Sequence, residues 1–460
     1  MAAHRGGAMM CEGGGPKRAA VIGAGAAGLV VSKLLRQFGH DVEVFEQTKN
    51  VGGVWQFDPT VEHDLLGKDK DTNKRVHSSI YEGLRTNLPR EVMAFADLEF
   101  GDEFSALRFP PHQAVQKYLE TYADAFSLRP LISFGRRVVS VEPLLGGGNH
   151  EGFRSVSWQV TTAASDGTPE GEEDITEVQD FDVVVVCNGH YSEPRCPNIP
   201  GEADFKGHLS HSHNYRNAKG FSGKRVVVVG ASSSGLDIAR EIALEAEAVF
   251  LSARQPLPQA PQGKHGKILA RAPPKRITST GVEFEDGTVE EGVDAIVYCT
   301  GYYYRFPFLS PDNGIVHLES GDGVKPLYHH LLPPDAPSLA FVGLPAKIVP
   351  FPLMEMQARY LAMVWAGQIA LPPEEEMARD AAVWEKQQEA LPDKYFHLMG
   401  GGQFGYNDDL ARLCSVAPLP AWRKRMYADC SRNKRAFPDT YRDVPLPSVQ
   451  DYMAAIDAES

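Results

Sequence analysis

The sequence predicts an α/β protein that contains two nucleotide-binding units, each built on a parallel β-sheet. Three observations lead to this fold class. A glycine-rich turn joins a short apolar strand to a helical segment at Gly23, and the same pattern recurs at Gly230. Each helical segment is followed by a further apolar strand, which completes a strand–helix–strand unit. The chain has 460 residues and so exceeds the length of about 250 to 300 residues at which single cores stop growing.

The first unit begins with a strand at residues 19–22 and continues through the turn Gly23, Ala24, Gly25, Ala26, Ala27 and Gly28 into a helix and a strand at residues 42–45. We expect Gly23 to make the tight turn, Gly25 to admit a pyrophosphate, and Gly28 to let the helix pack closely. Glu46 follows, eighteen residues after Gly28. A carboxylate there accepts hydrogen bonds from ribose hydroxyls and repels a 2′-phosphate. The first unit is therefore predicted to bind FAD or NAD.

The second unit begins with a strand at residues 226–229 and continues through the turn Gly230, Ala231, Ser232, Ser233, Ser234 and Gly235 into an amphipathic helix and a strand that ends near Ser252. The turn does not contain the G-x-S-x-G arrangement of a hydrolase serine. Arg254 lies nineteen residues after Gly235, where a guanidinium can bind a 2′-phosphate. The second unit is therefore predicted to bind NADP through Ser252 and Arg254; a surface arginine without this role is the alternative.

Composition narrows the classes of partner and compartment. A formal net charge of −14 disfavours nucleic acid as a partner. The sequence holds no apolar run long enough to span a membrane, and its Gly-rich beginning lacks the apolar core of a secretory signal, so a cytoplasmic protein is expected. The six cysteines include no C-x-x-C pair, which disfavours disulfides, a zinc site and a redox dithiol. We predict no metal site.

Residues 205–216 read FKGHLSHSHNYR and hold three histidines, His208, His211 and His213. Metal binding would need several ligands that converge with suitable geometry. The segment contains F-x-G-x-x-x-H-x-x-x-Y, a pattern on which the family resemblance given below rests and which uses only His211. His208 and His213 are therefore expected to be exposed neighbours, and His211 to orient the linker and the NADP unit without acting as an acid or a base.

Four elements in this order resemble the flavin-containing monooxygenase family: the first glycine turn with GGVW at residues 52–55, the histidine pattern, the second glycine turn, and CTGY at residues 299–302. The pattern ends in tyrosine, whereas the related Baeyer–Villiger enzymes have tryptophan there, so the chain resembles a heteroatom oxygenase. The phrases LRTNLPREVM, VCNGHYSEPRCPNIPG and FGYNDDLA are similar to the plant S-oxygenating branch, also described as glucosinolate S-oxygenase-like.

The resemblance implies a mechanism in which NADPH reduces FAD and the reduced flavin captures O2 as a C4a-hydroperoxide. A thioether or an amine then attacks the distal oxygen. The resemblance places Asn87 beside the flavin and the bound NADP as the catalytic residue; a turn-forming Asn before Leu-Pro is the alternative. Gly53 and Trp55 are expected to lie at the FAD site, although Trp55 also fits a structural aromatic.

The leading hypothesis is an S-oxygenase that acts on a small thioether with NADPH and O2. The alternatives are an N-hydroxylating or oxo-acid flavin monooxygenase and, more distantly, a non-catalytic dinucleotide-binding redox sensor. Four segments are expected: a disordered leader at residues 1–16, the first part of a Rossmann-like FAD domain at 17–204, an inserted NADP domain at 205–323, and a return segment at 324–460. Within the first domain, residues 153–162 and 181–189 are predicted to pair as a hairpin.

Overall fold

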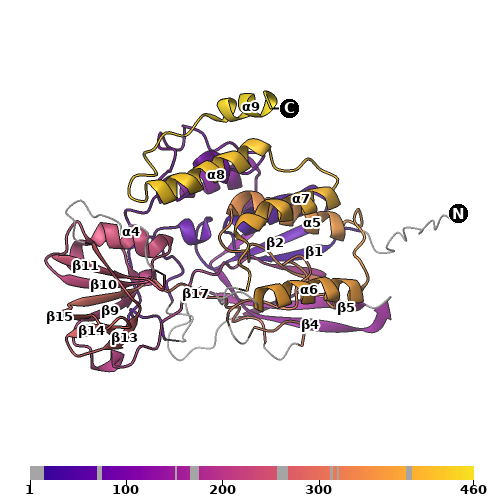
Figure 1. Ribbon diagram of the computed structural model, residues 1–460. Coiled ribbons are helices and arrows are strands. Elements are labelled where there is room, and N and C mark those ends of the chain that lie inside the picture. The colour runs from indigo at the N-terminus through magenta and orange to yellow at the C-terminus, as the bar shows by residue number, and fades with distance from the viewer. Residues whose placement is uncertain are drawn as a thin grey trace.

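The computed structural model describes residues 15–69, 75–150, 153–165, 176–255, 268–310, 314–318, 321–389 and 396–459. Two parallel sheets organise this part of the chain, and Figure 1 shows them in two lobes that lie side by side. The predicted fold class is confirmed. We call the lobe on the right of Figure 1 the first lobe and the lobe on the left, which carries α4 (Ser233–Ile242), the second lobe.

The sheet of the first lobe has the strand order β18-β7-β1-β2-β3, with every neighbouring pair parallel. The strands are β1 (Arg18–Ile22), β2 (Asp41–Glu46), β3 (Ile132–Phe134), β7 (Val183–Val186) and β18 (Leu339–Phe341). Continuous apolar runs suit strands that are covered on both faces. Helix α1 (Ala26–Gln37) packs against α5 (Pro350–Trp365), so a late segment of the chain completes the core around the first glycine turn.

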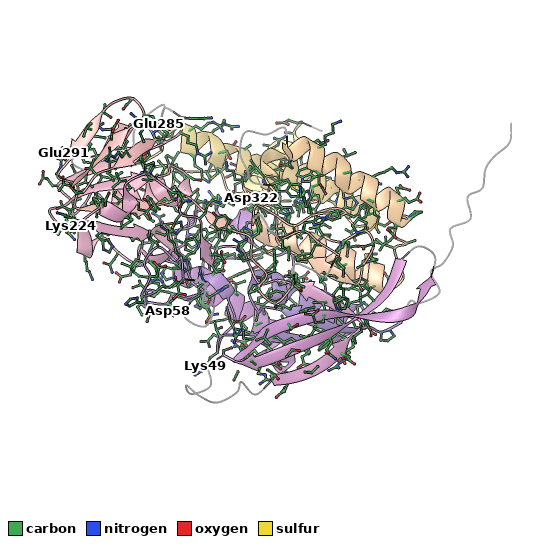
Figure 2. The ribbon with its side chains drawn as sticks, turned by 90° about the horizontal axis from the view of Figure 1, so that it is seen from below. Lys49, Asp58, Lys224, Glu285, Glu291 and Asp322 are labelled. Carbon is green, nitrogen blue, oxygen red and sulfur yellow. The ribbon has the colours of Figure 1, made fainter. Side chains whose placement is uncertain are left out.

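The sheet of the second lobe has the order β12-β11-β10-β16-β9 and is also parallel. Its strands are β9 (His208–His211), β10 (Arg225–Val229), β11 (Ala248–Ser252), β12 (Ile268–Arg271) and β16 (Ala295–Tyr298). Lys224, directly before β10, lies at the outer end of this lobe in Figure 2. The strands therefore run inward, and their carboxyl ends, where α/β sheets bind ligands, face the first lobe.

Antiparallel strands accompany both sheets. The first lobe carries β4 (Arg136–His150), β5 (Phe153–Ala164) and β6 (Thr176–Phe181); the second carries β13 (Pro274–Ile277), β14 (Gly281–Phe284) and β15 (Val289–Glu291). A two-stranded piece joins β8 (Glu193–Pro194) to β17 (Tyr302–Tyr303).

The predicted hairpin has a different second strand. β5 pairs with β6, which ends at Phe181, whereas the Val183–Val186 run is β7 of the parallel sheet. The prediction joined these two strands into one. Only Asp182 separates the two strands. Its backbone N–H donates to the Arg18 carbonyl where the chain enters the parallel sheet. Residues 166–175 of the predicted loop lie outside the described part of the chain.

Helices supply the remaining layers. Short α2 (Arg90–Met93) and α3 (His112–Ala125) belong to the first lobe, and α6 (Glu374–Glu389) and α7 (Gln403–Leu413) follow α5. Helix α8 (Ala421–Ala436) packs against α9 (Val449–Asp457), and Figure 1 shows both above the lobes. A helix of the length and apolarity that would cross a bilayer does not occur among the described residues.

Candidate active site

The first glycine turn adopts a backbone shape that side chains would prevent. Gly23 has φ +102°, and a β-carbon there would lie 2.7 Å from the Cys187 carbonyl oxygen. A β-carbon on Gly28 would lie 1.8 Å from the Gly23 carbonyl oxygen, so α1 touches the turn at this point. Ala26 and Ala27 form the buried first turn of α1. The N-terminus of α1 therefore presents its backbone N–H groups at the carboxyl edge of the sheet, as a pyrophosphate requires.

Glu46 is buried at the end of β2, and hydrogen bonds from the first glycine turn and from Thr48 hold its carboxylate in place. One carboxylate oxygen accepts the Ala24 backbone N–H at 2.7 Å, and the other accepts the backbone N–H and the hydroxyl of Thr48 at 2.8 Å each. Each oxygen has two lone pairs, so the pair that remains can accept ribose hydroxyls. The carboxylate thus fits the adenosine end of FAD with its orientation already set.

The GGVW segment approaches the first glycine turn backbone to backbone. A β-carbon on Gly53 would lie 3.0 Å from the Gly25 Cα, and the Gly52 N–H donates to the Ala24 carbonyl at 3.0 Å. Gly52 has φ +124° and leaves room for the Gln116 side chain, whose amide donates to the Val51 carbonyl at 2.8 Å. Trp55 is partly buried and packs against the core of the first lobe. Gly52 was predicted only as part of the GGVW segment, and Gln116 was not predicted from the sequence.

The second glycine turn repeats this construction. Gly230 has φ +106°, and a β-carbon there would lie 2.4 Å from the Cys299 carbonyl oxygen; a β-carbon on Gly235 would lie 1.8 Å from the Gly230 carbonyl oxygen. The Gly230 N–H donates to the Ser252 carbonyl at 2.9 Å, as the Gly23 N–H donates to the Phe45 carbonyl at 2.8 Å. The two units are therefore matched at the level of single backbone contacts.

Ser232, Ser233 and Ser234 are exposed where α4 begins. Ser232 occupies the N-cap position, and its side chain does not cap the helix, so the N-terminal N–H groups of α4 remain available to an anion. Ala231 packs against the core beneath the turn. Hydroxyls and backbone N–H groups at one helix N-terminus are the donor set that a nucleotide phosphate requires.

The two residues predicted to bind the 2′-phosphate lie in different environments. Ser252 is buried, and its hydroxyl donates to the Ala272 carbonyl at 2.9 Å. Its contribution to the site is therefore its backbone carbonyl, which holds Gly230. Arg254 lies two residues beyond β11 and is exposed, as a residue that binds a phosphate from solvent can be.

Asn87 brings the two lobes into contact. Its side-chain amide donates to the Ser233 hydroxyl at 3.3 Å, across 146 residues of sequence. The Thr86 backbone N–H donates to the Pro110 carbonyl at 2.9 Å, and the Thr86 hydroxyl donates to the Leu88 carbonyl at the same distance. The loop that carries Asn87 is therefore held by its own hydrogen bonds, and the amide reaches the first residue of α4.

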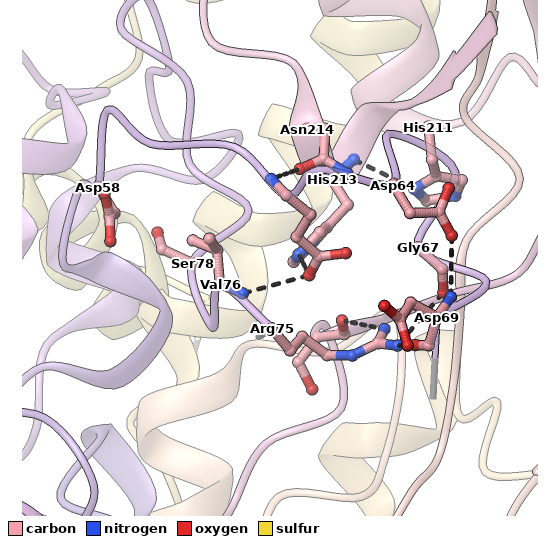
Figure 3. A network of polar contacts seen from close by, with 12 residues as sticks. Asp58, Asp64, Gly67, Asp69, Arg75, Val76, Ser78, His211, His213 and Asn214 are labelled. Atoms are coloured by element: carbon pink, nitrogen blue, oxygen red, sulfur yellow. Dashed lines mark hydrogen bonds and ion pairs between the residues drawn. The ribbon is translucent and has the colours of Figure 1, made fainter. Parts of the chain in front are cut away.

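Two of the three histidines in residues 205–216, the segment we call the linker, are buried and make contacts that hold the linker in place. His208 is exposed, as expected, but the prediction for His213 is wrong, because His213 and His211 are each 0% exposed. His213 Nε2 lies 3.2 Å from a Glu62 carboxylate oxygen, and the His213 backbone N–H donates to His211 Nδ1 at 3.1 Å. Both rings contact the Tyr302 ring edge to face. Figure 3 shows this network, with His213 and Asn214 directed toward the loop that carries Val76.

Arg216 extends the same network. Its guanidinium donates to the carbonyls of Asp58, Thr60, His213, Tyr215 and Ser78. The side chain is almost fully buried, and this burial lowers its pKa. On the other side, the Tyr215 hydroxyl donates to Glu241 of α4 at 2.6 Å. Arg216 and Tyr215 thus tie the backbone at Asp58, Thr60 and Ser78 to the helix that bears the second glycine turn.

Burial also decides the charge of His211. It lowers the pKa of His211 to about 3, so the ring is neutral at physiological pH. Its Nδ1 accepts the His213 backbone N–H, which fixes the orientation of the ring. This pKa lies far below the value near 7 that suits a catalytic acid or base.

The Asn87 contact joins the first lobe to the second glycine turn, and two glycine turns of this kind are the arrangement expected of an oxidoreductase that uses two dinucleotides. A model of the FMO-like family, described as flavin-binding monooxygenase-like, matches residues 16–257 and 261–422. The chain belongs to this family and is a flavin-containing monooxygenase. FAD and NADPH are its cofactors. The two turns fit them, because the helix N-terminus that follows each turn, at Gly25 and at Ser232, has no side-chain cap and can receive a phosphate.

The relatives agree with this assignment. Flavin-containing monooxygenase FMO GS-OX-like 4 of Arabidopsis thaliana is 40% identical over 436 residues, which cover 92% of this chain and 93% of the relative. The structure of S-allyl-L-cysteine S-oxygenase from Allium sativum has a TM-score of 0.85 at 40% identity and covers 97% of this chain and 98% of its own. Tmm from Pelagibacter sp. strain HTCC7211 has a TM-score of 0.77 at 25% identity, with 94% of each chain covered.

Proposed function

We propose that this protein converts a small thioether to its sulfoxide with NADPH and O2. One oxygen atom is transferred to the sulfur and the other leaves as water, with two electrons from NADPH and one further proton from solvent. The observation that carries the proposal is the likeness over nearly the whole chain to S-allyl-L-cysteine S-oxygenase, whose name states a thioether substrate. The Tyr215 ending of the histidine pattern, together with the plant-type phrases, supports the same branch.

Electron transfer from NADPH and activation of O2 are the chemistry that bound FAD supplies. The residues of the chain bind and orient. Glu46 holds the adenosine ribose of FAD, and the α1 N-terminus holds the pyrophosphate. The α4 N-terminus with Ser233 binds the NADP pyrophosphate, and Arg254 binds the 2′-phosphate.

Asn87 completes the site. Its amide can donate one hydrogen bond to Ser233 and retains a second N–H and a carbonyl oxygen for the reacting groups. In this role it holds the nicotinamide side of the site and excludes water from it. The boundaries of the FAD and NADP domains, near residues 205 and 323, stay part of this proposal.

The test is a substrate panel with the FAD-loaded protein. S-alkyl cysteines, dialkyl sulfides and tertiary and primary amines are each incubated with NADPH under air, and product is quantified by mass spectrometry beside NADPH loss. Sulfoxide formation that accounts for most of the NADPH consumed supports the proposal. Oxygenation of amines with thioethers left unchanged would assign the chain to an N-oxygenating enzyme.

A further inference from the structure

The C-terminal part of the chain reaches back to both lobes through Arg442, in the connection between α8 and α9. Its guanidinium is paired with the Asp237 carboxylate through both terminal nitrogens, at 2.6 and 3.2 Å. The same guanidinium donates to the Thr86 carbonyl at 3.0 Å and to the Arg85 carbonyl at 3.3 Å. One side chain thus joins α4 of the second lobe to the two residues that precede Asn87.

The hydrogen bonds of Arg442 are made close to the hydrogen bond between Asn87 and Ser233. Asp237 lies one helical turn after Ser233 on α4, since residues four apart occupy the same helix face. The Asn87 amide bonds to the start of that turn, while Arg442 bonds to its end and to the loop backbone. The distance between the loop and the helix is therefore set at two points, and Arg442 supplies one of them.

The surroundings make this clamp rigid. The side chains of Arg442 and Asp237 are 16% and 18% exposed, so water only partly screens the ion pair. The Arg442 guanidinium stacks over the ring of Tyr441, which is buried and meets the Phe109 ring edge to face. In the same loop, the Arg85 guanidinium donates to the Phe109 carbonyl at 3.0 Å.

A neighbouring arginine offers a matched comparison. Arg240, also on α4, donates to an Asp439 carboxylate oxygen at 2.7 Å and to the Pro438 carbonyl at 2.8 Å, and it shares Asp237 at 3.1 Å. It fastens the α8–α9 connection to the helix, as Arg442 does. Its described partners do not include the backbone of residues 85–87.

We propose that Arg442 is a positioning residue for Asn87: it holds the loop of residues 85–87 at the height on α4 where the Asn87 amide meets the second glycine turn. The inference rests on the proposed role of Asn87 beside bound NADP. When Arg442 is removed, the loop is free to separate from α4, NADP is held less tightly, and reduced enzyme loses its electrons to O2 as hydrogen peroxide.

The test compares Arg442→Ala, Arg442→Lys, Arg240→Ala and Asn87→Ser in FAD-loaded protein. The readouts are the NADP⁺ dissociation constant, from flavin fluorescence, and the peroxide released per NADPH consumed. For Arg442→Ala we expect the dissociation constant to rise about tenfold, because hydrogen bonds to charged groups are lost, and the peroxide fraction to rise as in Asn87→Ser. Arg240→Ala should change both readouts much less than Arg442→Ala, since the described partners of Arg240 do not include the loop that carries Asn87.

Lysine is not expected to rescue, because an ammonium cannot bind the carboxylate and two carbonyls in one plane as a guanidinium does. The double variant Arg442→Ala/Asn87→Ser should be no worse than Asn87→Ser, since residues that act through one another are not additive. Equal losses in Arg442→Ala and Arg240→Ala, or additive effects in the double variant, would overturn the inference.

Two safeguards keep the result interpretable. If Arg442→Ala does not fold with FAD, Asp237→Asn keeps the guanidinium and weakens the α4 half of the clamp together with the Arg240 contact, for which Arg240→Ala is the control. We expect a change in the same direction of about threefold, and an unchanged dissociation constant would refute the clamp. None of the readouts needs a thioether. A failure of the S-oxygenase assignment would therefore appear in the substrate panel and leave this comparison unaffected.

Discussion

The amide nitrogen of Asn87 lies 3.3 Å from the hydroxyl of Ser233, and this contact joins the first lobe to the glycine turn of the second. In the function proposed above, this is the place where the two cofactors meet. The proposed FAD site, the proposed NADP site and Asn87 can each be tested separately.

Replacing Asn87 with Ser should separate NADPH consumption from substrate oxygenation. Serine is too short to span the distance to Ser233, whereas the FAD contacts of Glu46 and the first glycine turn do not involve this residue. We expect FAD content to stay near that of the parent, with most NADPH electrons released as peroxide. The measurement is product and peroxide per NADPH; unchanged coupling would remove Asn87 from the catalytic site.

Replacing Arg254 with Ala should reduce the preference for NADPH over NADH. If the guanidinium contributes about 2 kcal/mol through charge-assisted hydrogen bonds, the preference falls about 30-fold. Steady-state kcat/KM with each nucleotide gives the ratio. Lys275→Ala is the control, because it removes an exposed positive charge from the same lobe at a site away from the glycine turn; a similar fall there would point to net charge alone.

Alanine substitutions in the two glycine turns should each weaken the binding of a different cofactor. A β-carbon at Gly235 would meet the Gly230 carbonyl oxygen at 1.8 Å, so Gly235→Ala must displace the start of α4, at a cost of about 1 to 3 kcal/mol. NADP⁺ should then bind roughly 10- to 100-fold more weakly while FAD is retained, and Gly28→Ala should show the reverse. Gly405→Ala in α7 serves as the control, since a β-carbon there meets no atom within 4 Å. Loss of both cofactors in both variants would contradict separate sites.

Acid should destabilise the fold through its buried histidines. Burial lowers the pKa of His211 and His330 to about 3 and that of His190 to about 4, against 6.5 when unfolded. The unfolded chain therefore binds more protons than the folded chain as pH falls. Stability is complete above pH 6.5 and declines below it, by about 2 kcal/mol per histidine between pH 7 and 5.

Thermal unfolding of the FAD-loaded protein at a series of pH values measures this slope. His211→Asn keeps a neutral acceptor for the His213 N–H and removes one titrating group, so its unfolding temperature should depend less steeply on pH between 6.5 and 5. A slope equal to that of the parent would show that His211 does not carry the effect.

The sequence predicted the local units well because their causes are local. Gly23 and Gly230 each need a positive φ, and the apolar runs beside them lie in parallel sheets as expected. The hairpin partner was wrong because two strands, the mostly polar β6 that ends at Phe181 and the apolar β7 that begins at Val183, are adjacent in sequence but belong to different sheets.

The sequence could not predict contacts whose partners lie far apart along the chain. His213 is buried because Glu62, 151 residues away, meets its ring, and a histidine in a polar stretch gives no sign of this. Arg442 and Asp237 are separated by 205 residues, and each belongs to an ordinary charged segment. The role predicted for Asn87 came from family resemblance. The structure adds the hydrogen bonds that hold the Asn87 loop, to Ser233 and from Arg442.

The cysteines beside the two glycine turns contribute their carbonyl oxygens to the cradles and keep their thiols inside the protein. Burial raises the pKa of Cys299 to about 12 and also raises that of Cys187. The other described cysteines, Cys196, Cys414 and Cys430, have raised pKa values as well. Peroxide attacks thiolates and spares protonated, enclosed thiols. Cys187 and Cys299 should therefore resist oxidation by the peroxide that uncoupled variants release.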